Sequence, residues 1–450
     1  MADVRLEALR ILGRVETGRD FAQDLIARSI AENRLDRRDA SLLTEIVCGA
    51  IRHRLTLDSA ISAFSKTPLR KLDAQCLHIL RMGLYQLIFL DRIPDAAAVN
   101  ESVKLTPQVR LASAKGFINA VLRAALRSMQ DPRAGAPADP RKSVYVREKT
   151  WAIFQKPVLP DPGDAPAYLA AAYSHPQWLV ERWLARFGME QSESILRADN
   201  ETPPLTVRVN RMKTDRAGLL GRLAEEGVQA AEGELSFSIR LGPGTRIVEL
   251  PSFKDGLFQV QDETAMRAAE ILDPQPGETI LELCAAPGGK TTDIAERMGD
   301  RGMIVAVDRS MPRLRAVREN LARLGLHSVY CIAADGTRRW WGRGRAFDRA
   351  LVDAPCSNTG VLARRVEARW RLRPQDIEEL AELQKGLVLA AAEALRPGGV
   401  LVYSTCSIEE AENEEVAAHV IEAAGLTKRS EQLFLPRKDA GGGYAAILTS

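Results

Sequence analysis

Cysteine and histidine are scarce in this chain of 450 residues, which has six cysteines and five histidines. No two cysteines are spaced as C-x-x-C and no two histidines as H-x-x-x-H, so the ligand spacing of a zinc site is missing. The cysteines lie at positions 48, 76, 284, 331, 356 and 406, which is too sparse and irregular for a disulfide scaffold. We therefore expect free thiols, a reducing cytoplasmic compartment and no bound metal.

Long apolar runs are missing as well. A membrane-spanning helix needs about twenty consecutive apolar residues, and no stretch of this sequence approaches that length. The longest candidate, residues 77–90, contains His78, Arg81 and Gln86 and is predicted to be a buried helix. The first ten residues, MADVRLEALR, lack the basic and then apolar layout of a signal peptide. We expect no contact with membranes.

The composition, 46% hydrophobic and 27% charged, is that of a globular protein, and the length predicts two or three domains. The net charge of +3 conceals an asymmetry. Residues 1–150 carry 25 Lys and Arg against 17 Asp and Glu, which is +8, whereas residues 151–450 carry 37 against 42, which is −5. A basic first third favours a polyanionic partner, although arginine-rich helix surfaces would give the same counts.

Hydrophobic residues repeat with helical period up to about residue 130. Residues 1–130 are therefore predicted to form an all-α domain. Prolines then become dense, and residues 131–174 are predicted to be a proline-rich, partly helical connection. Residues 175–250 mix helix and strand patterns, which predicts a small α+β unit.

Apolar strands alternate with amphipathic helices in residues 251–450. The strands are predicted at 279–283, 303–308, 329–335, 347–353 and 399–405. This alternation predicts an α/β domain with a parallel sheet covered on both faces. Ligands of such sheets bind at the carboxyl ends of the strands, where Cys284, Asp308, Asp335, Cys356 and Cys406 are expected.

The segment ELCAAPGGK, residues 282–290, predicts a strand, a small-residue turn and a helix N-terminus against which a ligand can lie. It matches neither G-x-G-x-x-G nor the nucleotide-phosphate loop, and a plain tight turn is the alternative. Asp308 could accept hydrogen bonds from the ribose hydroxyls of an adenosine-type ligand. Asp335 could accept one from the adenine amine, unless it caps a helix. Together these features predict a pocket for S-adenosylmethionine.

Two cysteines follow strand ends in similar settings, in DAPCS (353–357) and TCS (405–407). Such a pair could be a metal half-site, a disulfide, a catalytic pair or a coincidence. The [DN]-P-P-[YFW] tetrad of amino-methyltransferases is absent, which shifts the predicted methyl acceptor from an exocyclic nitrogen to a ring carbon. Methylation of carbon 5 of a pyrimidine needs a thiolate that adds to carbon 6, an acid that steadies nitrogen 3, and a close approach to the methyl donor, after which a base removes the carbon-5 proton. Cys406, Asp353 and Cys356 could supply these groups.

Three segments, LELCAAPGGKTT, VDAPCSNTG and YSTCSIEEAENEEV, resemble in that order the motifs of RNA 5-methylcytosine methyltransferases of the NOL1/NOP2/Sun type. The resemblance implies that Cys406 is the nucleophile, that Cys356 assists product release and that Asp353 contacts the base. It implies S-adenosylmethionine as cofactor, held by Cys284, Ala285, Ala286, Pro287, Gly288, Gly289, Lys290, Asp308, Asp335 and Asp353. DNA carbon-5 methyltransferases use the P-C cysteine as nucleophile, so the additional T-C cysteine discriminates the two classes.

The segments ALRILGRV, LRMGLYQLIFLDRIPDAAAVNESVKL and KGFINAVLR resemble the helical domain of NusB. This implies a NusB-like RNA-binding domain, an α+β RNA-binding subdomain and a Rossmann-like methyltransferase domain, in a family that methylates small-subunit (16S) ribosomal RNA. One departure is GGGYAAIL near the C-terminus, where the family usually shows an aromatic pair after Asp-Gly.

Two basic segments, 338–345 (RRWWGRGR) and 362–374 (LARRVEARWRLRP), are predicted to contact RNA, with a solvated loop as the alternative for the first. The target cytosine has to be single-stranded or flipped, and we expect a monomer. Two other hypotheses are an RNA scaffold with a vestigial methyltransferase domain and a DNA cytosine methyltransferase. The intact Asp353, Cys356 and Cys406 argue against the first, and the T-C cysteine argues against the second.

Overall fold

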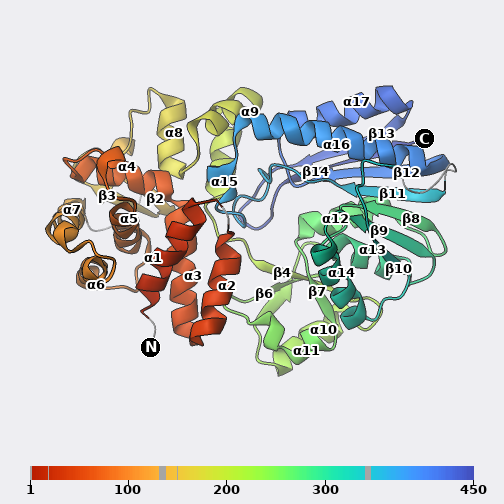
Figure 1. Cartoon of the computed structure of the whole chain (residues 1–450), viewed down its shortest axis with the longest axis horizontal. Coiled ribbons are helices and arrows are strands. Elements are labelled where there is room, and N and C mark those ends of the chain that lie inside the picture. Colours follow the sequence, from red (N-terminus) through yellow and green to blue (C-terminus); the bar gives the residue numbers. More distant parts are fainter. Residues whose placement is uncertain (1–2, 19, 131–137, 149, 340–345) are drawn as a thin grey trace. The chain divides into compact units, whose positions relative to one another are not determined.

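A computed structural model describes the chain except residues 1–2, 19, 131–137, 149 and 340–345 (Figure 1). The chain divides into two compact units. The first comprises Met1–Glu201 together with Arg365–Arg371, and the second comprises Thr202–Arg364 together with Leu372–Ser450. The short segment 365–371 therefore belongs to the first unit, although its neighbours in sequence on both sides belong to the second.

The first unit begins with helices, as predicted for residues 1–130. They are α1 (Val4–Glu16), α2 (Ala22–Asn33), α3 (Arg37–Arg52), α4 (Arg54–Phe64), α5 (Ala74–Phe89), α6 (Asp95–Gln108) and α7 (Lys115–Ser128), with the short 3-10 turns η1 (Leu69–Lys71) and η2 (Ala112–Ala114). The side chains of Asp3, Asp36 and Asp73 cap three of these helices by accepting backbone N–H groups of the first turn. Helix α5 is buried along most of its length, including His78 and Gln86, which confirms the predicted buried helix.

The connection after residue 130 contains a small sheet as well as the expected helix. Strands β1 (Met129–Gln130), β2 (Ser143–Arg147) and β3 (Thr150–Phe154) pair antiparallel in the order β1-β3-β2. The turn η3 (Pro140–Lys142) precedes β2, and helices α8 (Ala165–Tyr173) and α9 (Gln177–Ala198) follow the sheet. Val144, Ala152 and Phe154 are buried, so this sheet contributes to the core of the first unit.

Residues 365–371, which include α15 (Ala368–Arg371), pack inside the first unit. The Arg369 side chain is fully buried and donates to the carbonyl oxygens of Ser174 (3.1 Å) and Asp199 (2.9 Å). Trp370 Nε1 donates to the carbonyl oxygen of Ile51 at 2.7 Å. The prediction that this stretch contacts RNA is therefore wrong for Arg369, because its guanidinium satisfies carbonyl groups of a protein core. Residues 340–345 of the other basic segment lie outside the described part of the chain.

The second unit begins with a four-stranded antiparallel sheet in the order β5-β6-β4-β7. Its strands are β4 (Leu205–Val209), β5 (Ala230–Glu232), β6 (Ser238–Leu241) and β7 (Phe258–Val260), accompanied by α10 (Arg216–Glu225), η4 (Ile247–Glu249) and α11 (Pro251–Lys254). Val207, Leu219, Ile239 and Phe258 belong to its buried core. A small α+β unit was predicted for residues 175–250, but helix α9 belongs to the first unit and strand β7 lies after residue 250.

The larger sheet of the second unit has seven strands in the order β10-β9-β8-β11-β12-β14-β13. They are β8 (Thr279–Leu283), β9 (Met303–Asp308), β10 (Val329–Ala333), β11 (Phe347–Asp353), β12 (Leu395–Thr405), β13 (Thr427–Phe434) and β14 (Gly443–Thr449). The first five in chain order pair in parallel and correspond to the five predicted strands, although β10 ends two residues earlier and β12 begins four residues earlier than predicted. Strands β13 and β14, which the sequence patterns did not predict, add an antiparallel edge.

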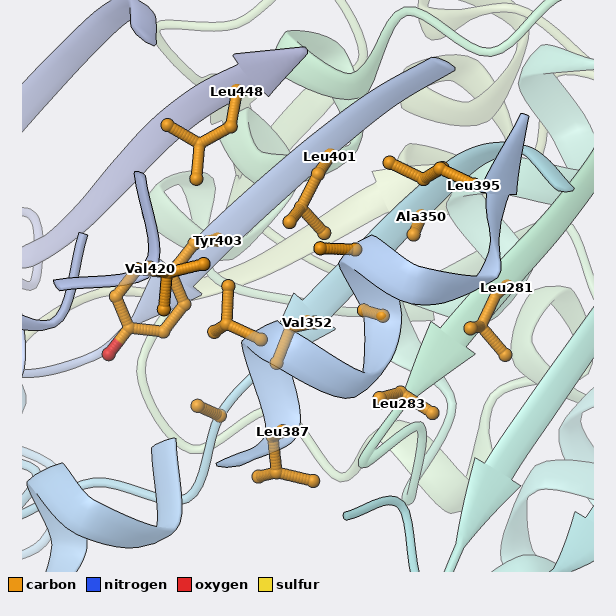
Figure 2. Close-up of a cluster of buried hydrophobic side chains, with 14 of the residues drawn as sticks. Leu281, Leu283, Ala350, Val352, Leu387, Leu395, Leu401, Tyr403, Val420 and Leu448 are labelled. Carbon is orange, nitrogen blue, oxygen red and sulfur yellow. The ribbon is translucent and has the colours of Figure 1, made fainter. Parts of the chain in front are cut away.

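Helices cover both faces of this sheet, as predicted for the α/β domain. They are α12 (Glu263–Leu272), α13 (Gly289–Arg297), α14 (Met311–Leu324), α16 (Pro374–Ala394) and α17 (Glu414–Ala424), with the turn η5 (Glu410–Glu412) before α17. Leu281, Leu283 and Val352 belong to a buried cluster with side chains of α16 and α17 (Figure 2). Ile280 and Leu351 belong to a second cluster with side chains of α12, α13 and α14. Successive strand residues point to opposite faces of the sheet, so both faces are packed against helices. Only the ends of the strands are therefore open to a ligand.

Candidate active site

The predicted site residues lie at the carboxyl ends of the parallel strands. Asp308 and Asp353 are the last residues of β9 and β11, and Cys284 and Cys406 directly follow the last residues of β8 and β12. The order of the strands reverses between β8 and β11, so this region is the topological switch point of the sheet. Doubly wound folds bind their ligands at this point.

A pocket of about 410 Å³ lies at these strand ends, a size suited to a small-molecule ligand. Its lining residues are Cys284, Val307, Asp308, Arg309, Arg313, Ala334, Asp335, Gly336, Thr337, Pro355, Leu380, Leu383 and Leu387. It brings together three of the predicted cofactor contacts, Cys284, Asp308 and Asp335. Residues 285–290 and Asp353 do not line it. The leucines of α16 form an apolar wall that the motifs alone did not identify, since nothing in the sequence pairs this helix with the strand ends.

Asp308 is oriented by its own loop. Its Oδ2 accepts from the backbone N–H of Ala286 (3.3 Å) and its Oδ1 accepts from that of Ser310 (2.9 Å). The Arg313 Nη1 lies 3.5 Å from Oδ2. Because a carboxylate offers about four lone-pair positions, both oxygens keep the capacity to accept a further hydrogen bond from a ligand hydroxyl.

Asp335 stabilises a turn and does not cap a helix. Its Oδ1 accepts from the backbone N–H (3.0 Å) and the hydroxyl (2.7 Å) of Thr337, and these bonds lower the pKa of the carboxyl. No helix follows among the described residues 336–339. The side chain is 54% exposed, so it can meet a ligand at the rim of the pocket.

The small-residue turn after β8 needs glycine for its own geometry. Gly288 has a φ of 97°, and a Cβ at this position would lie 3.0 Å from Val317 Cγ1 of α14. At Gly289 a Cβ would meet nothing closer than 3.8 Å. Gly288 is thus required by the left-handed backbone and by the packing of α14, and neither glycine lines the pocket.

The two cysteines of the DAPCS and TCS segments are in contact. Their Sγ atoms lie 2.9 Å apart, and all six cysteines are free thiols. The Cys406 Sγ also donates to Asn358 Oδ1 at 3.3 Å, and its backbone N–H donates to Cys356 Sγ at 3.3 Å. The hydrogen bond with Cys406, burial and the charge of Glu412 raise the pKa of Cys356 well above its ordinary value. Cys356 is therefore a buried thiol that keeps its proton, whereas Cys406 is partly exposed.

Lys290 and Asp353 form an ion pair, with Nζ 2.7 Å from Oδ2. Burial lowers the pKa of Lys290, but the charges of Asp353, Cys406 and Glu282 outweigh this effect and raise it. Lys290 was predicted to contact the cofactor. In the structure it forms an ion pair with Asp353 and is close enough to Cys406 for their charges to interact. The sequence motifs did not single out Glu282. This residue is buried near the end of β8, and its burial raises the pKa of the carboxyl to about 8.

Glycines allow the backbone to pack closely around Cys406. The Gly360 N–H donates to the carbonyl oxygen of Cys406 (2.9 Å), and the Gly442 N–H donates to that of Gly360 (2.6 Å). A Cβ at Gly360 would lie 2.6 Å from the carbonyl carbon of Gly442, and one at Gly443 would lie 2.6 Å from the carbonyl oxygen of Thr405. The unusual GGGY segment therefore forms part of the backbone that surrounds the T-C cysteine.

Metal-ligating groups of three or more His, Cys, Asp or Glu side chains do not occur among the described residues. In the same part of the chain, none of the helices has the length and apolar character needed to cross a membrane.

Family models match three successive parts of the chain. The NusB family matches residues 2–127, the ferredoxin-like domain of RsmF/B-like methyltransferases matches residues 175–246, and the 16S rRNA methyltransferases RsmB/F match residues 269–438. The probable ribosomal RNA small subunit methyltransferase B of Bacillus subtilis is 35% identical over 92% of this chain and 87% of its own length. Ribosomal RNA small subunit methyltransferase B of Pseudomonas putida is 36% identical over 92% of this chain and 87% of its own length. The chain belongs to this RsmB/F family of rRNA methyltransferases.

Solved structures share the fold of this RsmB/F family member. The crystal structure of PH0851 superposes with a TM-score of 0.78 at 24% identity, covering 99% of this chain and 97% of that one. The structure of NSun6 from Pyrococcus horikoshii with SFG has a TM-score of 0.56 at 26% identity, covering 61% and 98%. A methyltransferase homolog from the same organism has a TM-score of 0.57 at 28% identity, covering 64% and 99%.

Membership of the RsmB/F family confirms the resemblance read from the motifs, the NusB-like helical domain and the S-adenosylmethionine-dependent methyltransferase fold. The protein is an rRNA methyltransferase whose methyl donor is S-adenosylmethionine. The lining of the pocket suits such a cofactor, because Asp308 and Asp335 offer hydrogen-bond acceptors and Leu383 and Leu387 offer an apolar surface.

Proposed function

We propose that this chain methylates carbon 5 of a cytosine in 16S ribosomal RNA through a covalent bond between Cys406 and the base. The observation that carries the proposal is the contact between the two thiols, whose sulfur atoms lie 2.9 Å apart after the neighbouring strands β11 and β12. Two thiols in contact, with a partly exposed lysine–aspartate pair at the end of the neighbouring strand, suit covalent catalysis at a ring carbon.

Cys406 is the nucleophile in this proposal, because it is the more exposed of the two thiols. Its thiolate adds to carbon 6 of cytosine, which makes carbon 5 electron-rich. S-adenosylmethionine supplies the methyl group that carbon 5 takes up. A base then removes the proton of carbon 5, and the bond between carbon 6 and sulfur breaks to restore the ring double bond.

Cys356 assists the last step. Because its pKa is raised well above the ordinary value, it carries a proton and can donate a hydrogen bond. Its sulfur is in contact with that of Cys406, so the bond is available as the Cys406 sulfur departs with a negative charge. Loss of this donor would slow the departure of the thiolate more than its attack.

Asp353 orients the base. Its carboxylate can accept a hydrogen bond from the exocyclic amine of cytosine. The Lys290 ammonium, 2.7 Å from Oδ2, holds the carboxylate in place. The Lys290 ammonium would offset the negative charge that develops on the ring when the thiolate adds.

RNA binding is assigned in part to the first unit. The +8 charge of residues 1–150 and the match to the NusB family at residues 2–127 support this assignment. The cytosine has to be unpaired or flipped, because carbons 5 and 6 must both be reached.

We further propose that the protein works as a monomer in the cytoplasm. An RNA scaffold with a vestigial methyltransferase domain is disfavoured, since Cys356 and Cys406 are both present and in contact.

Two alanine substitutions separate the roles of the thiols. Cys406→Ala should abolish turnover and give no covalent protein–RNA complex, because no bond to carbon 6 can form. Cys356→Ala should also lose turnover but accumulate a complex that survives denaturing electrophoresis, because the product is not released. An adduct in Cys406→Ala alone would reverse the assignment and indicate the mechanism of DNA cytosine methyltransferases. Full activity in both variants would mean that the thiols are structural.

Bisulfite sequencing tests the position of the methyl group. 16S rRNA from cells with the gene should contain a cytosine that resists bisulfite conversion, and the same position should convert in cells without the gene. Equal conversion in both samples would contradict cytosine carbon-5 methylation.

A further inference from the structure

The buried carboxylate of Glu412 contacts both Ser357 and Ser407, the residues that directly follow the two cysteines. Glu412, in the turn η5, is completely buried. Its Oε1 accepts from the backbone N–H of Ser357 at 2.8 Å, and its Oε2 accepts from the hydroxyl of Ser407 at 2.6 Å. The Ser357 hydroxyl also donates to Oε2. One side chain therefore bridges the loop of Cys356 and the loop of Cys406.

The rest of the carboxylate's surroundings fixes it in place. Gln384 Nε2 of α16 donates to Oε1 at 3.0 Å, and the hydroxyl of Tyr403 donates to the backbone carbonyl of Glu412. Gln384 Nε2 also donates to the carbonyl oxygen of Pro355 at 2.8 Å, just before Cys356. A carboxylate with these donors is fixed in place, so it helps to set the distance between the two loops, beside direct hydrogen bonds between them such as that from the Ile408 N–H to Thr359 Oγ1 (3.0 Å).

The two loops depend on Glu412 to different extents. The loop of Cys406 directly continues strand β12 and is also held by Asn413, which accepts from the Thr405 hydroxyl (2.6 Å) and donates to the Ser407 carbonyl (3.0 Å). For Ser357, the backbone N–H and the shortest hydroxyl contact both go to Glu412. Weakening Glu412 should therefore release Ser357, next to Cys356, more than Ser407, next to Cys406.

We infer that Glu412 is a positioning residue that holds the Cys356 thiol against Cys406 for the release of the methylated product. This inference rests on the proposed function for the release step, but the contact between the thiols can be measured without RNA or cofactor. It also accounts for the serine that follows each cysteine in DAPCS and TCS, because the two serines share one acceptor.

Two conservative substitutions separate the reach of the side chain from its charge. Glu412→Asp keeps the charge but is one methylene shorter, so it cannot contact both serines at once. Glu412→Gln keeps the length and loses the charge, and the serine hydroxyls can rotate to suit its amide. Glu410→Asp is the matched control, because Glu410 is exposed in the same turn.

The first measurement is the rate at which diamide joins Cys356 to Cys406, followed by peptide mass mapping. The partly exposed Cys406 thiolate adds to the N=N bond of diamide, and the Cys356 sulfur then attacks the Cys406 sulfur and expels the hydrazine. The two thiols thereby lose two electrons and two protons to the reagent. We expect Glu412→Asp to slow the formation of the Cys356–Cys406 disulfide by about tenfold or more, because the two sulfur atoms are no longer held close together. Glu412→Gln and Glu410→Asp should stay within about threefold of the unmodified chain.

The second measurement is product release with RNA and S-adenosylmethionine. Glu412→Asp should accumulate the covalent protein–RNA complex, as expected for Cys356→Ala, while the double variant should accumulate no more than Cys356→Ala alone. Cofactor affinity, which should match that of the Glu410→Asp chain, and a cooperative thermal transition above the assay temperature separate these effects from misfolding.

Several outcomes would overturn the inference. A diamide rate in Glu412→Asp equal to that of the control would mean that Glu412 does not hold the thiols together. A slowed rate with normal product release would remove its part in catalysis. Loss of the adduct, as in Cys406→Ala, would assign Glu412 to the nucleophile instead. If Cys356→Ala itself accumulates no adduct, the proposed function fails, and the diamide rates still decide whether Glu412 sets the contact.

Discussion

The substitution Gly360→Ala tests how far catalysis depends on the close packing of backbone around Cys406. The added Cβ would lie 2.6 Å from the carbonyl carbon of Gly442, 2.7 Å from its oxygen and 2.8 Å from the carbonyl oxygen of Cys406. Non-bonded heavy atoms prefer separations of about 3.5–4.0 Å. All three neighbours are backbone atoms, so no side-chain rotation can relieve the overlap. The loop of Cys356 or the GGGY segment has to shift by roughly 1 Å.

The magnitude follows from this shift. Overpacking of this kind costs about 1–3 kcal/mol of the free energy of folding. A displacement of about 1 Å between reacting groups lowers the rate on the order of 100-fold. We therefore expect Gly360→Ala to slow methyl transfer about 100-fold, while the affinity for S-adenosylmethionine changes by less than about threefold. The affinity is spared because Asp308 ends β9 and Asp335 follows β10, away from the strands that carry the thiols.

Single-turnover transfer of a labelled methyl group measures the rate, and calorimetric titration measures the cofactor affinity. Gly386→Ala is the control, because its Cβ would meet Thr337 at an ordinary 3.6 Å and alanine suits the interior of α16. A rate in Gly360→Ala within threefold of that in Gly386→Ala would refute the reasoning that backbone contact sets the position of Cys406.

Two further predictions concern the cofactor and the first unit. Asp308→Ala should weaken S-adenosylmethionine binding by roughly tenfold or more, about 1.5–3 kcal/mol, since hydrogen bonds to a charged group are lost; an unchanged affinity in calorimetry would remove Asp308 from the site. Arg369→Ala should lower the free energy of unfolding by about 3–5 kcal/mol, because it leaves buried carbonyl groups and the buried Asp199 without their cationic neighbour. A loss below about 1 kcal/mol in chemical denaturation would contradict that role for Arg369.

Local patterns in the sequence predicted the elements that repeat or end in a motif. The five parallel strands carry continuous apolar runs, and Cys284, Asp308, Asp353 and Cys406 stand where those runs stop. Strand β13 escaped prediction because its sequence TKRSEQLF is mostly polar and exposed, so it has no alternation to detect. Its place in the sheet is set by pairing with β14, which is a contact between distant segments.

The sequence misjudged Glu412 and Arg369 for the same physical reason. Glu412 lies in an acidic stretch, EEAENEE, that looks like a solvated helix start, and only the fold buries it behind the thiols. Arg369 lies in an arginine-rich stretch that looks like an RNA-binding surface, yet its side chain is fully buried. In both cases charge in the sequence indicated exposure, whereas satisfied hydrogen bonds made burial possible.

The seven residues 365–371 also determine when the first unit can be completed during protein synthesis. The chain leaves the ribosome from its N-terminus, and domains generally fold as units as they emerge. The core of the first unit includes Arg369 and Trp370, which hydrogen-bond to residues of the N-terminal region. These side chains are made only after strands β8 to β11. The core of the first unit is therefore complete only after strands β8 to β11 of the second unit have been synthesised.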